Sequence, residues 1–151
     1  MTSLVRRFLK TGIVFLAIGL AIGAWMIVQR ELGGGLPSPW VTSAHTHAIL
    51  VGFVMMMILG VALWMFPRPA KGDTRYDPRL AEGAYWMLTV ATASRVLGEL
   101  VRATTDAPWL RWSVVVAGLL QVAGLLMFFA TMWSRIRGVG SAAREAAGER
   151  F

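Results

Sequence analysis

Cysteine is absent from this sequence of 151 residues. Its absence excludes disulfide bonds, thiolate metal sites, iron–sulfur clusters and haem attached covalently through a C-x-x-C-H motif. Charged residues are scarce, at 15%, and they gather in short blocks beside long apolar stretches. The net charge of +7 therefore does not form the basic patch of a nucleic-acid-binding protein, and no nucleic-acid partner is expected. Histidine is also rare, with two in the chain.

Apolar residues make up 56% of the chain, and the mean hydropathy is +0.60. These values exceed those of ordinary soluble domains. Four apolar segments, at about 12–29, 44–66, 83–101 and 112–133, each approach the ~20 residues that a helix needs to cross a bilayer. Their length and the lack of period-two alternation indicate helices. The sequence predicts an all-α membrane protein with four transmembrane helices in an up-down bundle.

The breaks between these segments carry turn residues. Gly33, Gly34, Gly35 and the sequence Pro37-Ser38-Pro39 interrupt the chain after the first segment. We expect Thr42 or Ser43 to be the N-cap of the second helix. The four segments belong to one domain, residues 1–137, and residues 138–151 form a polar tail.

Basic residues gather on one side of this topology. They lie before the first segment, in the loop after the second and behind the fourth: Arg6, Arg7, Lys10, Arg68, Lys71, Arg75, Arg79, Arg135, Arg137, Arg144 and Arg150. By the positive-inside rule, the N-terminus and the C-terminus are cytoplasmic, and the protein is a multi-pass protein of the inner (cytoplasmic) membrane. We expect the first helix to be an uncleaved span, although Arg6-Arg7 before it also suggests a twin-arginine export signal.

The two histidines lie close together in the sequence Ser43-Ala44-His45-Thr46-His47, at the predicted outer end of the second span. Ionisable side chains at membrane depth usually have a function, and imidazole is a common ligand of haem, copper and zinc. Residues i and i+2 point about 200° apart around an α-helix, so the two rings cannot both bind one metal ion. In the alternative interpretation both are interfacial residues bonded to the first loop.

The second span also resembles a known family. His45-Thr46, Gly52-Phe53, Gly60, Trp64 and Pro67-Arg68 resemble the second helix of subunit I in haem–copper oxidases and nitric oxide reductases. The resemblance implies a haem b site with His45 as axial ligand. A related nitric oxide response family, with haem and copper, also has a His-x-His before a Gly-Phe helix. The segment from Gly118 to Phe129 is similar to a later helix of subunit I.

The resemblance has limits. In a full subunit I, further histidines hold the second axial position, the high-spin haem and the copper, and none of them has a counterpart here. We therefore do not expect this chain alone to reduce O₂ or NO. What the resemblance implies for this sequence is one haem b site at most.

Three arrangements would complete such a haem iron. Met26, predicted at the depth of His45, is one candidate for the second ligand. A second copy of the chain, in a homodimer, is another, with His45 or His47 from each copy. Gly19 and Gly23 form a G-x-x-x-G motif that allows close helix contact, either between copies or within one chain. An open position would favour NO, CO or O₂.

Charged residues in the third segment suggest a role beside the haem. Arg95 and Glu99 are spaced to pair along one helix face. In the functional interpretation Arg95, with Arg102 or Arg30, binds the haem propionates. In the structural interpretation the pair only fixes helix packing.

The sequence thus supports a haem b protein in respiratory electron transfer or diatomic gas binding, with a second copy or a respiratory-chain partner. A cofactor-free structural or assembly subunit is a second hypothesis. A copper-handling protein, using both histidines with loop or methionine donors, is a third.

Overall fold

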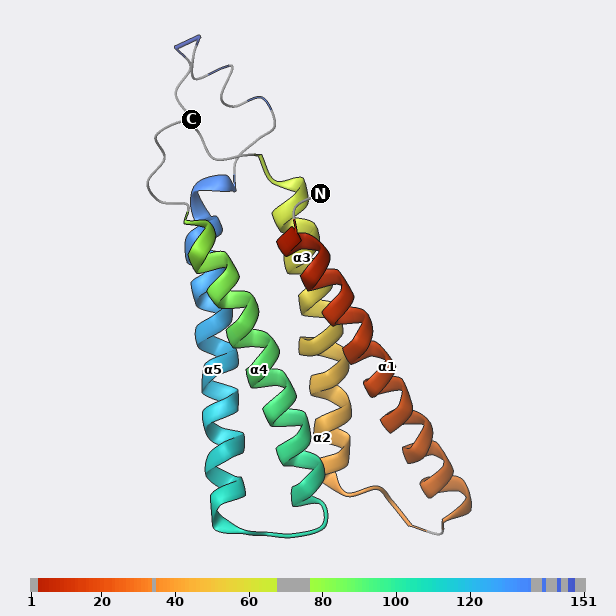
Figure 1. Cartoon of the computed structure of the whole chain (residues 1–151). Coiled ribbons are helices and arrows are strands. Elements are labelled where there is room, and N and C mark those ends of the chain that lie inside the picture. The colour runs from red at the N-terminus through yellow and green to blue at the C-terminus, as the bar shows by residue number, and fades with distance from the viewer. Residues whose placement is uncertain are drawn as a thin grey trace.

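The computed structural model describes residues 3–33, 35–67 and 77–136, with positions 140, 144, 147 and 148 of the tail. Helices make up nearly all of this part of the chain, which contains no β-strand. The prediction of an all-α protein built on four long helical segments is confirmed (Figure 1). They are α1 (Ser3–Leu32), a continuous segment from Pro39 to Met65, α4 (Pro78–Arg102) and α5 (Pro108–Met132). Most of the predicted tail, 138–151, lies outside the described residues.

The segment from Pro39 to Met65 changes its helical form twice. It begins as an α-helix, α2 (Pro39–His47), continues as a π-helix, η1 (Ala48–Met55), and ends as an α-helix, α3 (Met56–Met65). At the end of the chain's last long helix, a short 3₁₀-helix, η2 (Trp133–Arg135), follows α5. Hydropathy predicts the presence of the second helix but not its π-helical middle.

Helices α2 and α4 begin earlier than the apolar pattern suggests. The side chain of Ser38 accepts a hydrogen bond from the backbone N–H of Trp40, and Pro39 follows as the first residue of α2. Proline suits this position because its missing N–H would have no helical partner there. The prediction of Thr42 or Ser43 as N-cap is therefore wrong, since both lie inside α2. Asp77 caps α4 in the same way, before Pro78.

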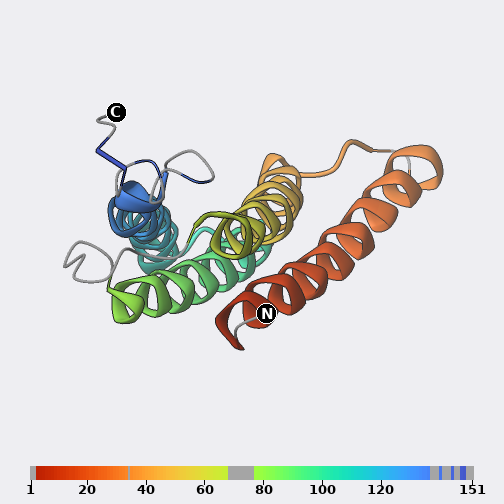
Figure 2. The ribbon, with the colours of Figure 1, turned by 90° about the horizontal axis from the view of Figure 1, so that it is seen from above.

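The helices lie in the order α1, second segment, α4, α5 when viewed down the bundle (Figure 2). At one end, here called the Arg135 end, α1 also reaches α5: the Phe8 ring is 5.1 Å from that of Tyr85 and 5.8 Å from that of Phe128, edge to face. Arg135, which is 5% exposed, donates hydrogen bonds to the carbonyls of Leu63, Phe66 and Pro67. Apolar packing and this guanidinium close the bundle here.

At the opposite end, here called the histidine end, α1 diverges from α4 and α5 (Figure 1). Ile22 of α1 packs there against a small group of buried residues, namely Ala44 of α2, Ala48 of η1 and Val96 of α4. Three helical stretches of the described chain, Ser3–Leu32, Pro39–Met65 and Pro108–Arg135, are long and apolar enough to cross a membrane. Helix α4 is not one of them, and it carries Arg95 and Glu99 along its length.

Candidate histidine site beside helix α1

His45 reaches across from α2 to α1. Its Nδ1 lies 2.8 Å from the backbone oxygen of Gly19. The ring also covers Gly23, where an added Cβ would come within 2.8 Å of the His45 Cε1 atom and 3.2 Å of Nδ1. Gly19 and Gly23, the two glycines of the G-x-x-x-G motif, therefore contact this imidazole within the same chain. Of the two roles considered for the motif, this is helix contact within one chain.

A groove of about 740 Å³ adjoins His45. Helix α1 contributes Gly23, Met26 and Arg30 to its lining, and Pro37 of the first loop completes one side. Most of the lining surface is apolar, and Arg30 provides a cation. His45 and Met26, predicted as possible haem ligands, and Arg30, predicted as a possible propionate partner, thus line the same groove.

His47 faces a different neighbour. Its Nδ1 lies 2.8 Å from the backbone oxygen of Ser43 and 3.3 Å from Oε2 of Glu99 on α4. The two rings therefore point to different helices, as the i, i+2 spacing predicts. In both rings Nδ1 is occupied, and no hydrogen bond within the described chain involves Nε2.

Glu99 is the centre of a buried polar network. Its side chain is 1% exposed. Ser43 donates to Oε1 at 2.9 Å, and Arg95 Nε donates to the same oxygen at 3.1 Å. Arg95 also donates to Gln121 on α5, which donates in turn to Thr92. The predicted Arg95–Glu99 pair is present, and it links the second helix with α4 and α5.

Arg102 lies apart from the groove lining and from this network. Its guanidinium stacks over the Trp40 ring at 3.7 Å and pairs with Asp106 at 3.2 Å. Asp106 also accepts hydrogen bonds from Arg111, which lowers the pKa of its carboxyl below the ordinary value. Neither Arg95 nor Arg102 lines the groove beside His45, where Arg30 is the arginine present.

The family model for cytochrome c and quinol oxidase polypeptide I matches residues 3–144. The chain belongs to this family. No curated protein and no solved structure matches it. Family membership and the three apolar helical stretches together make this chain an integral membrane protein related to oxidase subunit I, in contact with the lipid bilayer.

For this member of the oxidase subunit I family, the described residues contain no group of three or more His, Asp or Glu side chains placed to hold a metal ion. Two supporting residues were not predicted from the sequence: Gly19, through its carbonyl, and Ser43, through its hydroxyl. Backbone acceptors leave no sequence signal, whereas Ser43, four residues before His47, is detectable as a helical neighbour.

Proposed function

We propose that this subunit I relative binds haem b, with His45 as an axial ligand, and acts in respiratory electron transfer or in binding a diatomic gas. The observation that carries the proposal is the bond between His45 Nδ1 and the Gly19 carbonyl. Metal-binding imidazoles usually donate one ring N–H to a carbonyl or carboxylate, which orients the other nitrogen for the metal. His45 has that arrangement, beside a groove.

The groove suits such a group chemically. Cofactor sites are concave, mostly apolar and furnished with a few polar groups that set orientation. Here the apolar lining would enclose a porphyrin, and the Arg30 guanidinium would bind a propionate. Haem, when bound, supplies one-electron redox chemistry or an iron that binds diatomic gases. The protein would hold the axial ligand in position, limit the access of water to the haem and offset the charge of the propionate.

Two sources compete for the second axial position. Met26 lines the same groove as His45, and a thioether ligand would raise the reduction potential. A second copy of the chain would instead supply an imidazole, His45 or His47, in a homodimer. Because the G-x-x-x-G motif seats His45 within one chain, it no longer favours a dimer. Met26→Leu separates the alternatives, since only thioether ligation is lost with it.

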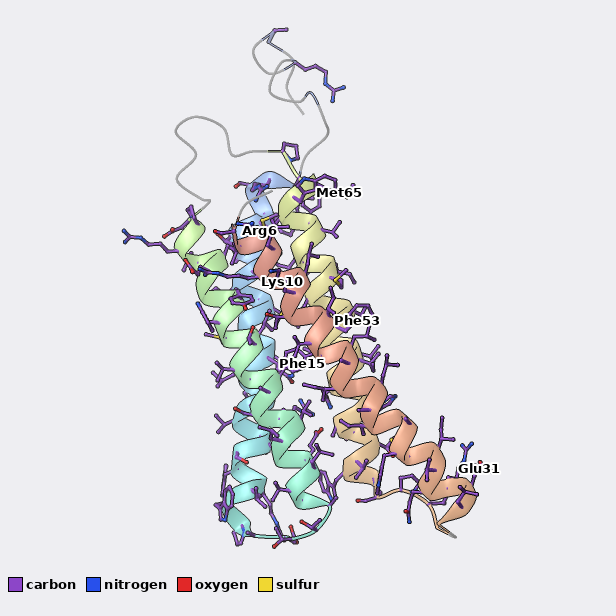
Figure 3. All side chains as sticks on the ribbon, turned by 45° about the vertical axis from the view of Figure 1, so that its right-hand side comes forward. Arg6, Lys10, Phe15, Glu31, Phe53 and Met65 are labelled. Atoms are coloured by element: carbon purple, nitrogen blue, oxygen red, sulfur yellow. The ribbon has the colours of Figure 1, made fainter. Side chains whose placement is uncertain are left out.

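We further propose that all four helical segments cross an inner membrane and that both termini are cytoplasmic. Arg6 and Lys10 lie near one end of α1, and Glu31 lies near the other (Figure 3). The network of Arg95 and Glu99 supports α4 as a span, because paired charges are the form in which ions are tolerated at membrane depth. Labelling single introduced cysteines at the two ends from outside intact cells tests this topology.

One observation favours the second hypothesis, a structural or assembly subunit without cofactor. His47 is held by Ser43 and Glu99 within a network that joins three helical segments, which is sufficient reason for an imidazole to be there. Within the part of the chain that the structure describes, the Gly19 carbonyl is the only hydrogen-bond partner of the His45 side chain. A copper function receives less support, because the two rings face different helices.

Haem content tests the proposal. The purified protein, produced with haem available, should contain b-type haem, and His45→Ala should lose it while His47→Ala keeps most of it. A wild-type protein that is folded, monodisperse and unable to take up added haem would refute the haem function and favour the structural one. A shift of the reduced Soret band on adding CO would indicate an open axial position.

A further inference from the structure

A cavity of about 500 Å³, here called the wedge, lies between α1 and α4 at the histidine end, where the two helices diverge (Figure 1). Three helices contribute to its lining, which includes Ile22 and Trp25 of α1, Val41 of α2, and Leu100 and Thr104 of α4. The groove beside His45 is lined by other residues of α1. The wedge is therefore a second site, separate from the proposed haem site.

The lining of the wedge becomes more polar toward the helix ends. Deeper in the bundle, Ile22 and Leu100 pack against the buried group around Ala44, which closes the wedge there. At the histidine end the lining finishes with two hydroxyl side chains, those of Ser38 just before α2 and Thr104 just after α4. A cavity that is apolar inside and polar at the helix ends matches half of a bilayer, with hydrocarbon below and headgroups above.

The extent of the wedge suits a hydrocarbon chain and not another transmembrane helix. A partner helix would need a facing surface along the ~20 residues that cross the bilayer. The wedge is lined by α1 only within residues 21–25 and by α4 only within residues 100–104. Toward the Arg135 end, α1 and α4 meet again, since Thr11 is hydrogen-bonded to the hydroxyl of Tyr85 at 2.8 Å. An acyl chain needs only the depth of one leaflet.

Positive charge lies beside the wedge. The Arg102 guanidinium stacks over the ring of Trp40, the residue before the lining residue Val41, at 3.7 Å. Arg102 and Arg111 share one carboxylate, that of Asp106, which leaves an excess of one positive charge. Within the described chain, the hydrogen bond of the Arg102 side chain is made by Nη2, and its Nη1 has no such partner. A guanidinium with unused N–H groups is suited to bind a phosphate.

We propose that the wedge binds one anionic phospholipid from the leaflet at the histidine end, with an acyl chain between α1 and α4 and its phosphate at Arg102. The lipid fills the space that opens as α1 diverges, and it links α1 to α4 where the two helices have no direct packing. Trp25 and Trp40 lie at the level that indoles prefer, beside the headgroups. The inference does not rest on the proposed haem function.

Photocross-linking in vesicles tests the proposal. The protein is reconstituted into phosphatidylcholine vesicles with a minor fraction of phosphatidylglycerol that carries a photoreactive diazirine in its acyl chain. Mass spectrometry of the peptides then locates the cross-links. We expect them to concentrate within residues 21–25 and 100–104. Added unlabelled phosphatidylglycerol should reduce them more strongly there than on the exposed face of α5.

Filling the wedge should remove these cross-links. In the double variant Ala21→Phe, Ala103→Phe, an aromatic ring from each wall occupies the cavity, because both positions line it. We expect cross-linking at the wedge to fall at least about tenfold, which corresponds to the exclusion of about two methylene groups. The double variant Ala123→Phe, Ala130→Phe is the matched control, since both positions are exposed on α5 and neither lines the wedge. It should keep the wild-type pattern.

The place of the phosphate is tested through charge. In Arg102→Gln the preference of the wedge for phosphatidylglycerol over phosphatidylcholine should fall about fivefold, the effect of one cation beside an anionic headgroup. The preference is measured as the ratio of cross-links from the two lipids, each with the same diazirine chain. Arg111→Gln is the matched control, because Arg111 contacts Asp106 in the loop. It should keep most of the preference.

Each alternative occupant gives a different result. Cross-links spread evenly over the lipid-facing residues overturn the proposal, and so does unchanged labelling in a filled variant that is folded by circular dichroism and gel filtration. Cross-links between two protein copies within residues 21–25 would show that a second chain covers the wedge instead. Equal loss of preference in Arg102→Gln and Arg111→Gln overturns the place of the phosphate. The wild-type pattern and Arg102→Gln decide even if the filled variant does not fold, and none of these measurements depends on haem.

Discussion

The imidazole of His45 lies against Gly23 of α1, so closely that a methyl group there would come within 2.8 Å of its Cε1 atom. The same ring bonds through Nδ1 to the Gly19 carbonyl, one turn along α1. A histidine that contacts a neighbouring helix at two positions has little rotational freedom. The orientation of Nε2 in this subunit I relative is therefore set by two glycines on another helix.

Replacing Gly23 should disturb the position of the His45 ring against α1. In Gly23→Ala the new methyl group forces the His45 ring away from α1, and we expect haem affinity to fall by about 10- to 100-fold, as for other changes behind a metal ligand. Gly12→Ala is the matched control on the same helix, because its Cβ would meet its nearest atom at 3.4 Å, an ordinary contact. Haem titration of the two proteins measures the difference. Equal affinities would show that the ring is not confined as described.

Glu99 should be needed for stability. Glu99→Gln removes the carboxylate that accepts from Arg95 and leaves a partly buried guanidinium uncompensated, so the free energy of unfolding should fall by about 3 kcal/mol. Unfolding in mixed detergent micelles measures this loss. Glu82→Gln breaks the exposed pair with Arg7 and should cost less than about 1 kcal/mol. If both variants lose the same stability, the buried network does not hold these helices together.

Arg135 should fasten the second helix to the end of α5. Arg135→Ala removes hydrogen bonds to the carbonyl of Leu63 in α3 and to those of Phe66 and Pro67 just after it, and we expect a loss of about 3 kcal/mol, since bonds from charged donors are individually worth about 1.5–3 kcal/mol. Arg135→Lys should recover only part of it, because an ammonium cannot span several acceptors. Thermal unfolding followed by circular dichroism compares them. Full recovery in the lysine variant would contradict the role of the forked geometry.

The stability of the folded protein should depend on pH through Asp106, which lies in the loop between α4 and α5. Hydrogen bonds from Arg111 lower the pKa of this carboxyl in the folded protein. The contribution of a lowered acid pKa is present above the unfolded value and is lost as the pH falls through the folded one. Asp106→Asn should therefore lower the melting temperature slightly at pH 7 and converge with the wild type in strong acid. A difference that grows on acidification would contradict this ion pair.

The sequence was sufficient to predict the four helices, because long apolar runs and proline-rich breaks determine where helices form in lipid. It was also sufficient for the separation of the two histidines and for the Arg95–Glu99 pair, since both follow from α-helical spacing within one element. The start of α2 was misplaced because hydropathy ignores capping. Ser38 and Pro39, both visible in the sequence, carry the correct signal.

Long-range partners could not be predicted in the same way. The Gly19 carbonyl that receives His45 and the contact of Arg102 with Trp40 depend on how helices pack, which no spacing rule for a single helix gives. The π-helix is an intermediate case. The four-residue recurrence from Ala44 to Gly60 is visible in the sequence, but the contacts that Ala48, Gly52 and Gly60 make with α1 are not.

The most direct test is the reduced-minus-oxidised visible spectrum of purified wild-type protein, recorded beside His45→Ala and His47→Ala at equal protein concentration. We predict the α and β bands of b-type haem in the wild type, their loss in His45→Ala, and their retention in His47→Ala. Bands that persist without His45 and disappear without His47 would contradict the assignment of the ligand. A wild-type spectrum with no haem bands after reconstitution would contradict haem binding altogether.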